Sequence, residues 1–233
     1  MIATFTALLF AHVIADFALQ TPAMVKHKRR TGIMLLHAAI VLATAQAATG
    51  HVAAPALLAL AAVHLVIDGI KTYGNFNSFT AFTVDQTAHV VSITALAWIA
   101  PDLWDTGIWA AYPALLPAMV LITGVIVTLT AGQHAIALLM RPHSQRIRNN
   151  GLRDGGRQIG LLERGLIFLF ILTGLPLGVG FLIGAKSILR FGTASRDQRT
   201  AEYVIIGTLA SFGWALVAAL ATQAVLGHVH PLR

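Results

Sequence analysis

The sequence predicts an all-α fold, a polytopic bundle of about seven transmembrane helices. Of the 233 residues, 57% are hydrophobic and 11% are Asp, Glu, Lys or Arg, whereas a soluble domain carries about 25% charged residues. The mean hydropathy is +0.75, and several apolar stretches are long enough to cross a bilayer. A chain with so few polar residues cannot cover the surface of a water-soluble globule of this size.

Each apolar stretch approaches or exceeds the roughly 20 residues that a helix needs to cross a membrane. The stretches end at polar, proline or glycine breaks, such as Pro22 and Pro101. Within the sixth stretch, Pro176 and its neighbouring glycines leave two alternatives open, one continuous helix or a broken, re-entrant pair. The seven stretches are residues 2–20, 32–48, 53–72, 82–100, 112–140, 160–185 and 203–226.

The distribution of charge predicts orientation and partners. Lys and Arg number 16 against 9 acidic residues, for a net charge of +7. In a membrane protein this excess marks cytoplasmic loops and contact with anionic lipid, so we expect membrane lipid as a partner and no nucleic acid. Basic residues follow the first, third and fifth stretches, which predicts an N terminus outside and a C terminus in the cytoplasm. The basic residues within 186–199 fit this orientation only if the sixth stretch is broken.

Histidine and aspartate recur inside the first four stretches, where ionisable residues are costly and suggest function. Three of the four stretches carry His and Asp four residues apart, a spacing that places both side chains on one helical face. The order is His then Asp in the first and third stretches and Asp then His in the fourth. Since the fourth stretch runs in the opposite direction, all three aspartates are expected nearer the cytoplasmic end. The residues are His12, Asp16, His37, His64, Asp68, Asp85 and His89.

These seven side chains predict a metal site. The chain has no cysteine, so its metal ligands must be His nitrogens and carboxylate oxygens, which bind zinc, manganese or iron. We expect zinc first, with manganese and iron as alternatives. Seven groups exceed one tetrahedral site and suit two metals that share a carboxylate. Asp16 or Asp85 is the expected catalytic base where it is not a ligand, and Gln86 and Gln20 are expected to orient ligands. The alternative is that the pairs are hydrogen bonds that hold helices together.

The C-terminal third has a different chemistry. Glu163 and Arg164 begin the sixth stretch, and Lys186 and Arg190 follow its end. Two interpretations stay open, an ion pair involving Glu163 or an anion pocket for a lipid phosphate built from Lys186, Arg190 and Arg164. Three regions therefore follow: a four-helix metal-site half at 1–100, the fifth helix with a basic loop at 101–158, and C-terminal helices at 159–233.

Three segments carry a family resemblance: AHVIADFALQTPAMVKHKR, HLVIDGIKTY and DQTAHVV. They resemble a bacterial membrane-protein family known as domain of unknown function 3307, and the second half is similar to that family's longer members. This resemblance implies a multi-pass protein of the bacterial inner membrane. The same segments look distantly similar to membrane-bound metal-dependent hydrolases, which implies the seven His and Asp residues as ligands, although the His-rich signature of those hydrolases is not reproduced.

Four functions follow from these observations. The first is a membrane-embedded, metal-dependent hydrolase that acts on a phospho-ester or lipid-linked substrate at the cytoplasmic leaflet. The second is a divalent-metal transporter, which requires polar groups through the whole membrane, whereas the outer halves of the first four stretches are almost purely apolar. The third is a membrane di-iron oxidase, which the missing Glu-x-x-His motif disfavours. The fourth is a non-catalytic membrane scaffold.

Overall fold

The computed structural model describes residues 1–144, 154–194 and 198–229, and within these ranges it contains helices and loops but no strand. The all-α prediction is therefore confirmed. The chain forms two compact units, Met1–Ile126 with the residues from Val225 onward, and Val127–Ala224. The boundary falls inside the predicted 101–158 region, and the predicted division into three regions stays a prediction.

Five helical runs in the described residues are long and apolar enough to cross a membrane. The predicted fourth stretch is a helix that is not among these five, and the predicted sixth is two helices. The membrane class is thus supported, while the count of about seven stays a prediction. The five runs are Ile2–Leu19, Thr31–Thr49, Pro55–Tyr73, Leu115–Ser144 and Gln198–Val229.

The first unit is built around its N-terminal helix. α1 packs against α3, α5 and α6, and α4 packs against α3 and α5. Small residues such as Ala7 and Ala11 are fully buried and let neighbouring helices approach α1 closely. The elements are α1 (Ile2–Val13), η1 (Ile14–Leu19), α2 (Pro22–Lys26), α3 (Thr31–Thr49), α4 (Pro55–Tyr73), α5 (Phe79–Ile99) and α6 (Leu115–Ile126).

The first predicted span is not a regular α-helix along its whole length. It changes to the π-helical segment η1 at Ile14, so Asp16 lies in a wider turn than His12. A π turn advances each residue through a smaller angle than an α turn, so the His12–Asp16 spacing no longer aligns the two side chains as a regular helix would. The Nδ1 atom of His12 lies 4.0 Å from Oδ1 of Asp16, which leaves that carboxylate facing other helices.

The two ends of this helical bundle have different surroundings. At one end, the side chain of Ser78 accepts a hydrogen bond from the backbone N–H of Ala81 and begins α5. At the other end, Gly50 closes α3 in the left-handed conformation with φ of 75°. The residues that follow α5 are anchored beside Gly50, because Trp109 donates from Nε1 to the carbonyl of Ala47 and Thr4 donates to the carbonyl of Pro101. These bonds close the bundle at the end where α1 begins.

The second unit contains a helical hairpin where one long helix was an open alternative. α8 ends at Leu172, Gly174 has a φ of 73°, and α9 begins after Pro176. Proline removes a backbone donor and clashes with the preceding turn, and the left-handed glycine reverses the chain. The broken alternative is therefore correct. The elements are η2 (Val127–Ala131), α7 (Gly132–Ser144), α8 (Gly155–Leu172), α9 (Leu177–Ala194) and α10 (Gln198–Val229), the last reaching the first unit from Val225.

Arg164 of α8 stabilises the π-helical segment η2 in this unit. A π segment interrupts the regular ladder of backbone hydrogen bonds and leaves carbonyls for other donors. The guanidinium of Arg164 donates from Nε to the carbonyl of Thr128 at 3.0 Å and from Nη2 to the carbonyl of Leu129 at 3.2 Å. It also donates to Oγ of Ser211 in α10 at 3.1 Å. One buried cation thus joins three elements of the second unit.

We predict that Arg164→Met lowers the thermal unfolding temperature of the detergent-purified protein by about 5–10 °C. Each buried carbonyl left without a donor costs about 1–3 kcal/mol. The substitution removes the donors of two such carbonyls in η2 at once. The unfolding temperature of Arg164→Lys should lie between those of the unmodified protein and Arg164→Met, because an ammonium cannot reproduce the planar fork of donors. Arg157→Met, in the exposed first turn of α8, is the control and should stay within about 2 °C of the unmodified protein. An unchanged unfolding temperature in Arg164→Met would contradict this role.

Candidate metal centre

All seven predicted ligands meet in one buried cluster of the first unit. α1 and η1 provide His12 and Asp16, α3 provides His37, and α4 and α5 provide two residues each. Every one of these side chains is at most 9% exposed. Three overlapping groups place one ligand atom per residue within 4.8 Å of one another. The groups are His12 with His64 and His89, Asp16 with His37 and His64, and Asp68 with Asp85 and His89.

Four ligand atoms of the cluster form five of the six edges of a tetrahedron of the size of a metal site. Nε2 of His37 lies 3.3 Å from Oδ1 of Asp16, 3.4 Å from Oδ2 of Asp68 and 3.3 Å from Nε2 of His64. Nε2 of His64 lies 3.5 Å from each of the same two carboxylate oxygens. The centre of a tetrahedron with such edges lies about 2.0–2.1 Å from each corner, which is the length of zinc bonds to His nitrogen and carboxylate oxygen. These residues could therefore supply ligands to a divalent metal, with Asp16, His37 and His64 within 4.8 Å of one another.

Two lysines neutralise carboxylates of the cluster from its outer side. Nζ of Lys28 lies 2.7 Å from Oδ2 of Asp68, and Nζ of Lys71 lies 2.6 Å from Oδ2 of Asp85. The two carboxylates are 3–4% exposed, whereas Lys28 is 14% exposed and Lys71 is 31% exposed. Buried carboxylates require a paired cation or a metal. Since Lys28 contacts the same oxygen that forms a corner of the tetrahedron, this ammonium stands beside the position of a metal.

Gln86 links His12 to the Asp85 carboxylate. Its Oε1 lies 3.3 Å from Nε2 of His12, and its Nε2 donates to Oδ2 of Asp85 at 3.1 Å. An amide oxygen only accepts, so this contact assigns the proton of His12 to Nε2 and leaves the lone pair on Nδ1. Nδ1 is buried and has no hydrogen-bond partner among the described residues. Gln86 therefore orients a potential ligand, as predicted from its place beside Asp85.

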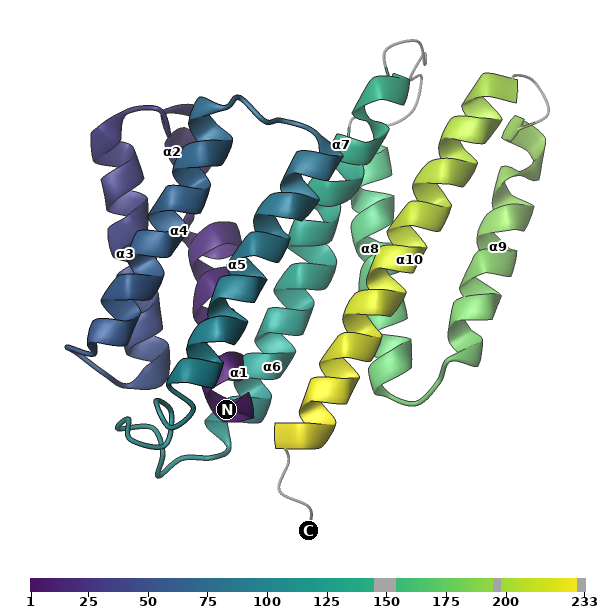
Figure 1. Ribbon diagram of the computed structural model, residues 1–233. Coiled ribbons are helices and arrows are strands. Elements are labelled where there is room, and N and C mark those ends of the chain that lie inside the picture. Colours follow the sequence, from purple (N-terminus) through teal and green to yellow (C-terminus); the bar gives the residue numbers. More distant parts are fainter. Residues whose placement is uncertain (145–153, 195–197, 230–233) are drawn as a thin grey trace. The chain divides into compact units, whose positions relative to one another are not determined.

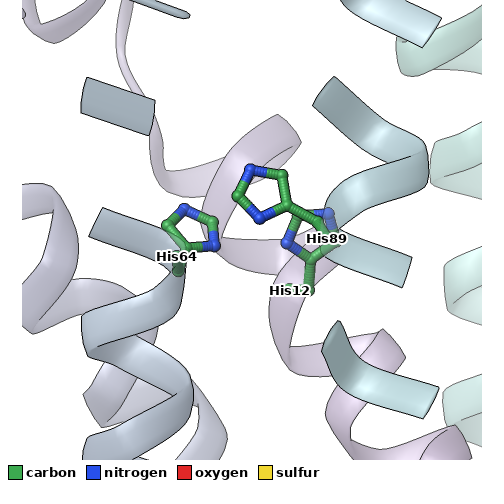
Figure 2. Close-up of side chains that lie close together, drawn as sticks. All are labelled: His12, His64 and His89. Atoms are coloured by element: carbon green, nitrogen blue, oxygen red, sulfur yellow. The ribbon is translucent and has the colours of Figure 1, made fainter. Parts of the chain in front are cut away.

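His89 has no hydrogen bond to either ring nitrogen among the described residues, although the ring is 1% exposed. Its ring stacks on His64 with centroids 4.1 Å apart, and its Nε2 lies 3.7 Å from Oδ1 of Asp85. Figure 2 shows the rings of His12, His64 and His89 gathered between their helices. A buried polar group without a partner costs about 1–3 kcal/mol. This cost is offset when the nitrogen binds a metal.

The cluster has a polar side and an apolar side. Towards the start of α1, the histidines meet a tightly packed core that includes Leu8, Leu57, Leu60 and Ile93. A cavity of about 10 Å³ borders His12, His64 and His89 on this side. On the other side lie the aspartates and then the two lysines. Of the charged groups around the cluster, the two lysines are the most exposed.

The depth order predicted from the sequence agrees with these distances, but three features were missed. His37 does contact the aspartates Asp16 and Asp68, as expected for one level of the bundle. Lys28 and Lys71 were counted only as loop charges. The position of Lys71, three residues after Asp68 on the same helix, was the available signal for a lysine near the site. Nothing in the sequence indicated the π segment that turns Asp16 towards α3 and α4.

The predicted anion-binding residues lie in the second unit, where two of them have protein partners. Nζ of Lys186 lies 2.6 Å from Oε2 of Glu163, so Glu163 does form an ion pair, but its partner is Lys186 where the sequence predicts Arg190 or a neighbour of Arg164. The three hydrogen bonds of Arg164 go to η2 and Ser211. The side chain of Arg190 lies outside those that the structure describes. A cavity of about 450 Å³ borders Lys186 and Arg164, and anion binding there stays a prediction.

The segment that contains the whole cluster matches a known family. Residues 4–109 match the family described as Protein of unknown function (DUF3307), which confirms that resemblance. Neither the curated proteins nor the solved structures include a match to this chain. The distant similarity to membrane-bound metal-dependent hydrolases stays a prediction.

We predict that the purified protein binds a fixed number of zinc ions per chain when zinc is added back after chelation and the excess is removed by desalting. Asp68→Asn and His64→Ala should each reduce the retained metal at least about ten-fold, since each removes one corner of the tetrahedron. Elemental analysis by plasma mass spectrometry gives the ratio. His27→Ala is the matched control, because His27 lies in the turn after α2 and bonds only to the carbonyl of Ala23 among its described contacts. Equal metal in all four proteins would contradict the site.

Proposed function

We propose that the protein is a membrane-embedded, metal-dependent hydrolase that acts on a phospho-ester or lipid-linked substrate at the cytoplasmic leaflet. The observation that carries this proposal is the buried cluster in which His37 and His64 each lie within 3.5 Å of the carboxylates of Asp16 and Asp68. These four residues hold the first metal. A metal at this position would activate a water for attack and neutralise charge on the phosphoryl oxygens.

The remaining three predicted ligands form a second position. His12, Asp85 and His89 each present an atom without a hydrogen bond among the described residues: Nδ1, Oδ1 and both ring nitrogens respectively. Asp68 lies within 4.8 Å of Asp85 and His89 as well as near the first position. A carboxylate shared in this way is the usual bridge between two metals about 3.5–4 Å apart. Zinc suits both donor sets, with manganese and iron as alternatives.

Asp85 is the group in position to accept a proton. Lys71 and Gln86 both bind its Oδ2, whereas its Oδ1 has no hydrogen-bond donor among the described residues. In hydrolysis, the water oxygen forms a bond to phosphorus as the bond from phosphorus to the leaving alcohol breaks. The water proton passes to Oδ1 of Asp85 and from there to the leaving oxygen. Asp85 takes this role where its Oδ1 is not a ligand of a second metal, and Asp16 takes it only where it is not a ligand of the first.

Three observations distinguish this proposal from its alternatives. The apolar core beyond the histidines interrupts a polar path, which counts against a metal transporter. A scaffold held by His–Asp hydrogen bonds should satisfy its buried polar atoms, yet His89 has neither ring nitrogen bonded among the described residues. A di-iron oxidase would require Glu-x-x-His motifs, which the sequence lacks.

The proposed orientation in the membrane follows from the polar side of the cluster, where the aspartates and the two lysines lie. Lys26, Lys28, Arg29 and Arg30 connect η1 to α3 beside the polar side. Basic loops of this kind are typically cytoplasmic and contact anionic headgroups. We therefore place the N terminus outside a bacterial inner membrane, with membrane lipid as the partner. The predicted cytoplasmic C terminus does not follow from this arrangement, because α8 and α9 add a crossing and Val229 packs on the same core as Ala3.

We predict metal-dependent hydrolysis of bis-p-nitrophenyl phosphate or p-nitrophenyl phosphate by the detergent-purified protein. Removal of metal with a chelator should abolish p-nitrophenolate release, and zinc or manganese should restore it. Asp68→Asn and His64→Ala should lose at least about a hundred-fold in rate, since both remove the metal that activates water. His27→Ala should retain the full rate. Full activity of Asp68→Asn, or activity that survives chelation, would overturn the proposal.

A further inference from the structure

The charges around the cluster do not balance once a metal is present. Asp16, Asp68 and Asp85 contribute three negative charges, and Lys28 and Lys71 contribute two positive charges when the histidines are neutral. The cluster without metal therefore has one negative charge in excess. One divalent ion reverses this to one positive charge in excess. In an apolar surrounding, such an excess favours binding of an anion.

The geometry identifies the lysine that becomes the surplus cation. Oδ2 of Asp68 is both a corner of the tetrahedron and the partner of Lys28. A metal at the first position neutralises that carboxylate and leaves Lys28 without a counter-charge. Oδ2 of Asp85 lies outside these four corner atoms, so Lys71 keeps its partner at 2.6 Å when one equivalent of metal fills the first position alone. Lys28 also lies between the buried Asp68 and solvent, at 14% exposure.

We infer that Lys28 is the residue that binds the phosphate group of the substrate, and that the substrate class is an anionic phosphate ester. This inference rests on the proposed function. An anionic phosphate entering past α2 meets the Lys28 ammonium first and the metal next, so one anion contacts both. A lysine ammonium binds phosphate as a point charge with three donors. The phosphate is either a soluble ester or the headgroup of a lipid, which share this chemistry.

The test is titration calorimetry of the zinc-loaded protein in detergent with inorganic phosphate, and in a second arm with a short-chain phosphatidate. We expect Lys28→Met to weaken phosphate binding by about ten- to a hundred-fold, the usual effect of losing a charge-assisted hydrogen bond. Lys28→Arg should keep most of the affinity. The zinc content of each variant is measured by elemental analysis alongside the calorimetry. Lys28→Met should hold at least as much zinc as the unmodified protein, because the Lys28 ammonium no longer competes with the metal for Asp68.

Two control variants separate Lys28 from general charge. Lys26→Met removes an exposed lysine two residues earlier, and Lys71→Met removes the lysine that stays paired with Asp85. Both should change phosphate affinity less than about three-fold. Equal weakening in Lys28→Met and Lys71→Met, or no weakening in Lys28→Met, would overturn the assignment. Lys28-dependent binding of the phosphatidate alone would support it with a lipid headgroup as the ligand.

Failure of the inference and failure of the proposed function give different results. If the protein retains no zinc, the proposed function fails and the charge argument fails with it. If zinc is retained and phosphate affinity does not depend on Lys28, only the inference fails. If phosphate binding depends on Lys28 but no ester is hydrolysed, the anion site stands and the hydrolase proposal fails.

Discussion

The first unit depends on the compensation of three carboxylates inside an apolar bundle. Asp16, Asp68 and Asp85 lie where water is excluded, and a buried carboxylate is tolerated only when paired with a cation or a metal. Lys28 and Lys71 provide part of this compensation from outside, and four histidines surround the rest. The choice of helices that pack together follows from this requirement, since each carboxylate needs partners that come from other helices.

The second unit pairs its buried charged groups, Glu163 and Arg164, within the protein. Arg164 donates to two carbonyls of η2 and to Ser211, and Lys186 pairs with Glu163. The metal cluster in the first unit instead contains nitrogens and oxygens that have no hydrogen-bond partner among the described residues. Both units contain a π-helical segment, but only the second unit compensates its π carbonyls with side chains that these contacts identify. The contrast favours a ligand at the histidines and a structural role for Arg164.

The sequence was sufficient for the fold class and for the membership of the cluster, because both depend on periodicity. The four-residue spacing of His64 and Asp68, together with the antiparallel direction of the helix that carries Asp85, placed these residues at one depth before any coordinates. It was insufficient for the partition of seven ligands into a tetrahedron and a second group. That partition depends on the rotation of each helix about its axis, which spacing leaves undetermined. Lys28 was beyond prediction because its reach to Asp68 depends on the path of the turn after α2.

Because of the π segment η1, the number of residues between His12 and Gln20 determines which way Asp16 and the following turn face. One residue fewer between Ile14 and Leu19 would restore a continuous α-helix and rotate everything beyond it by about 100°. Asp16 would then leave the face shared with His37 and His64, and the turn that carries Lys28 would begin from a different side of the bundle. Any substitution preserves this arrangement as long as the residue count is kept. The cluster is therefore more sensitive to a single deletion in this segment than to changes in the identity of its apolar side chains.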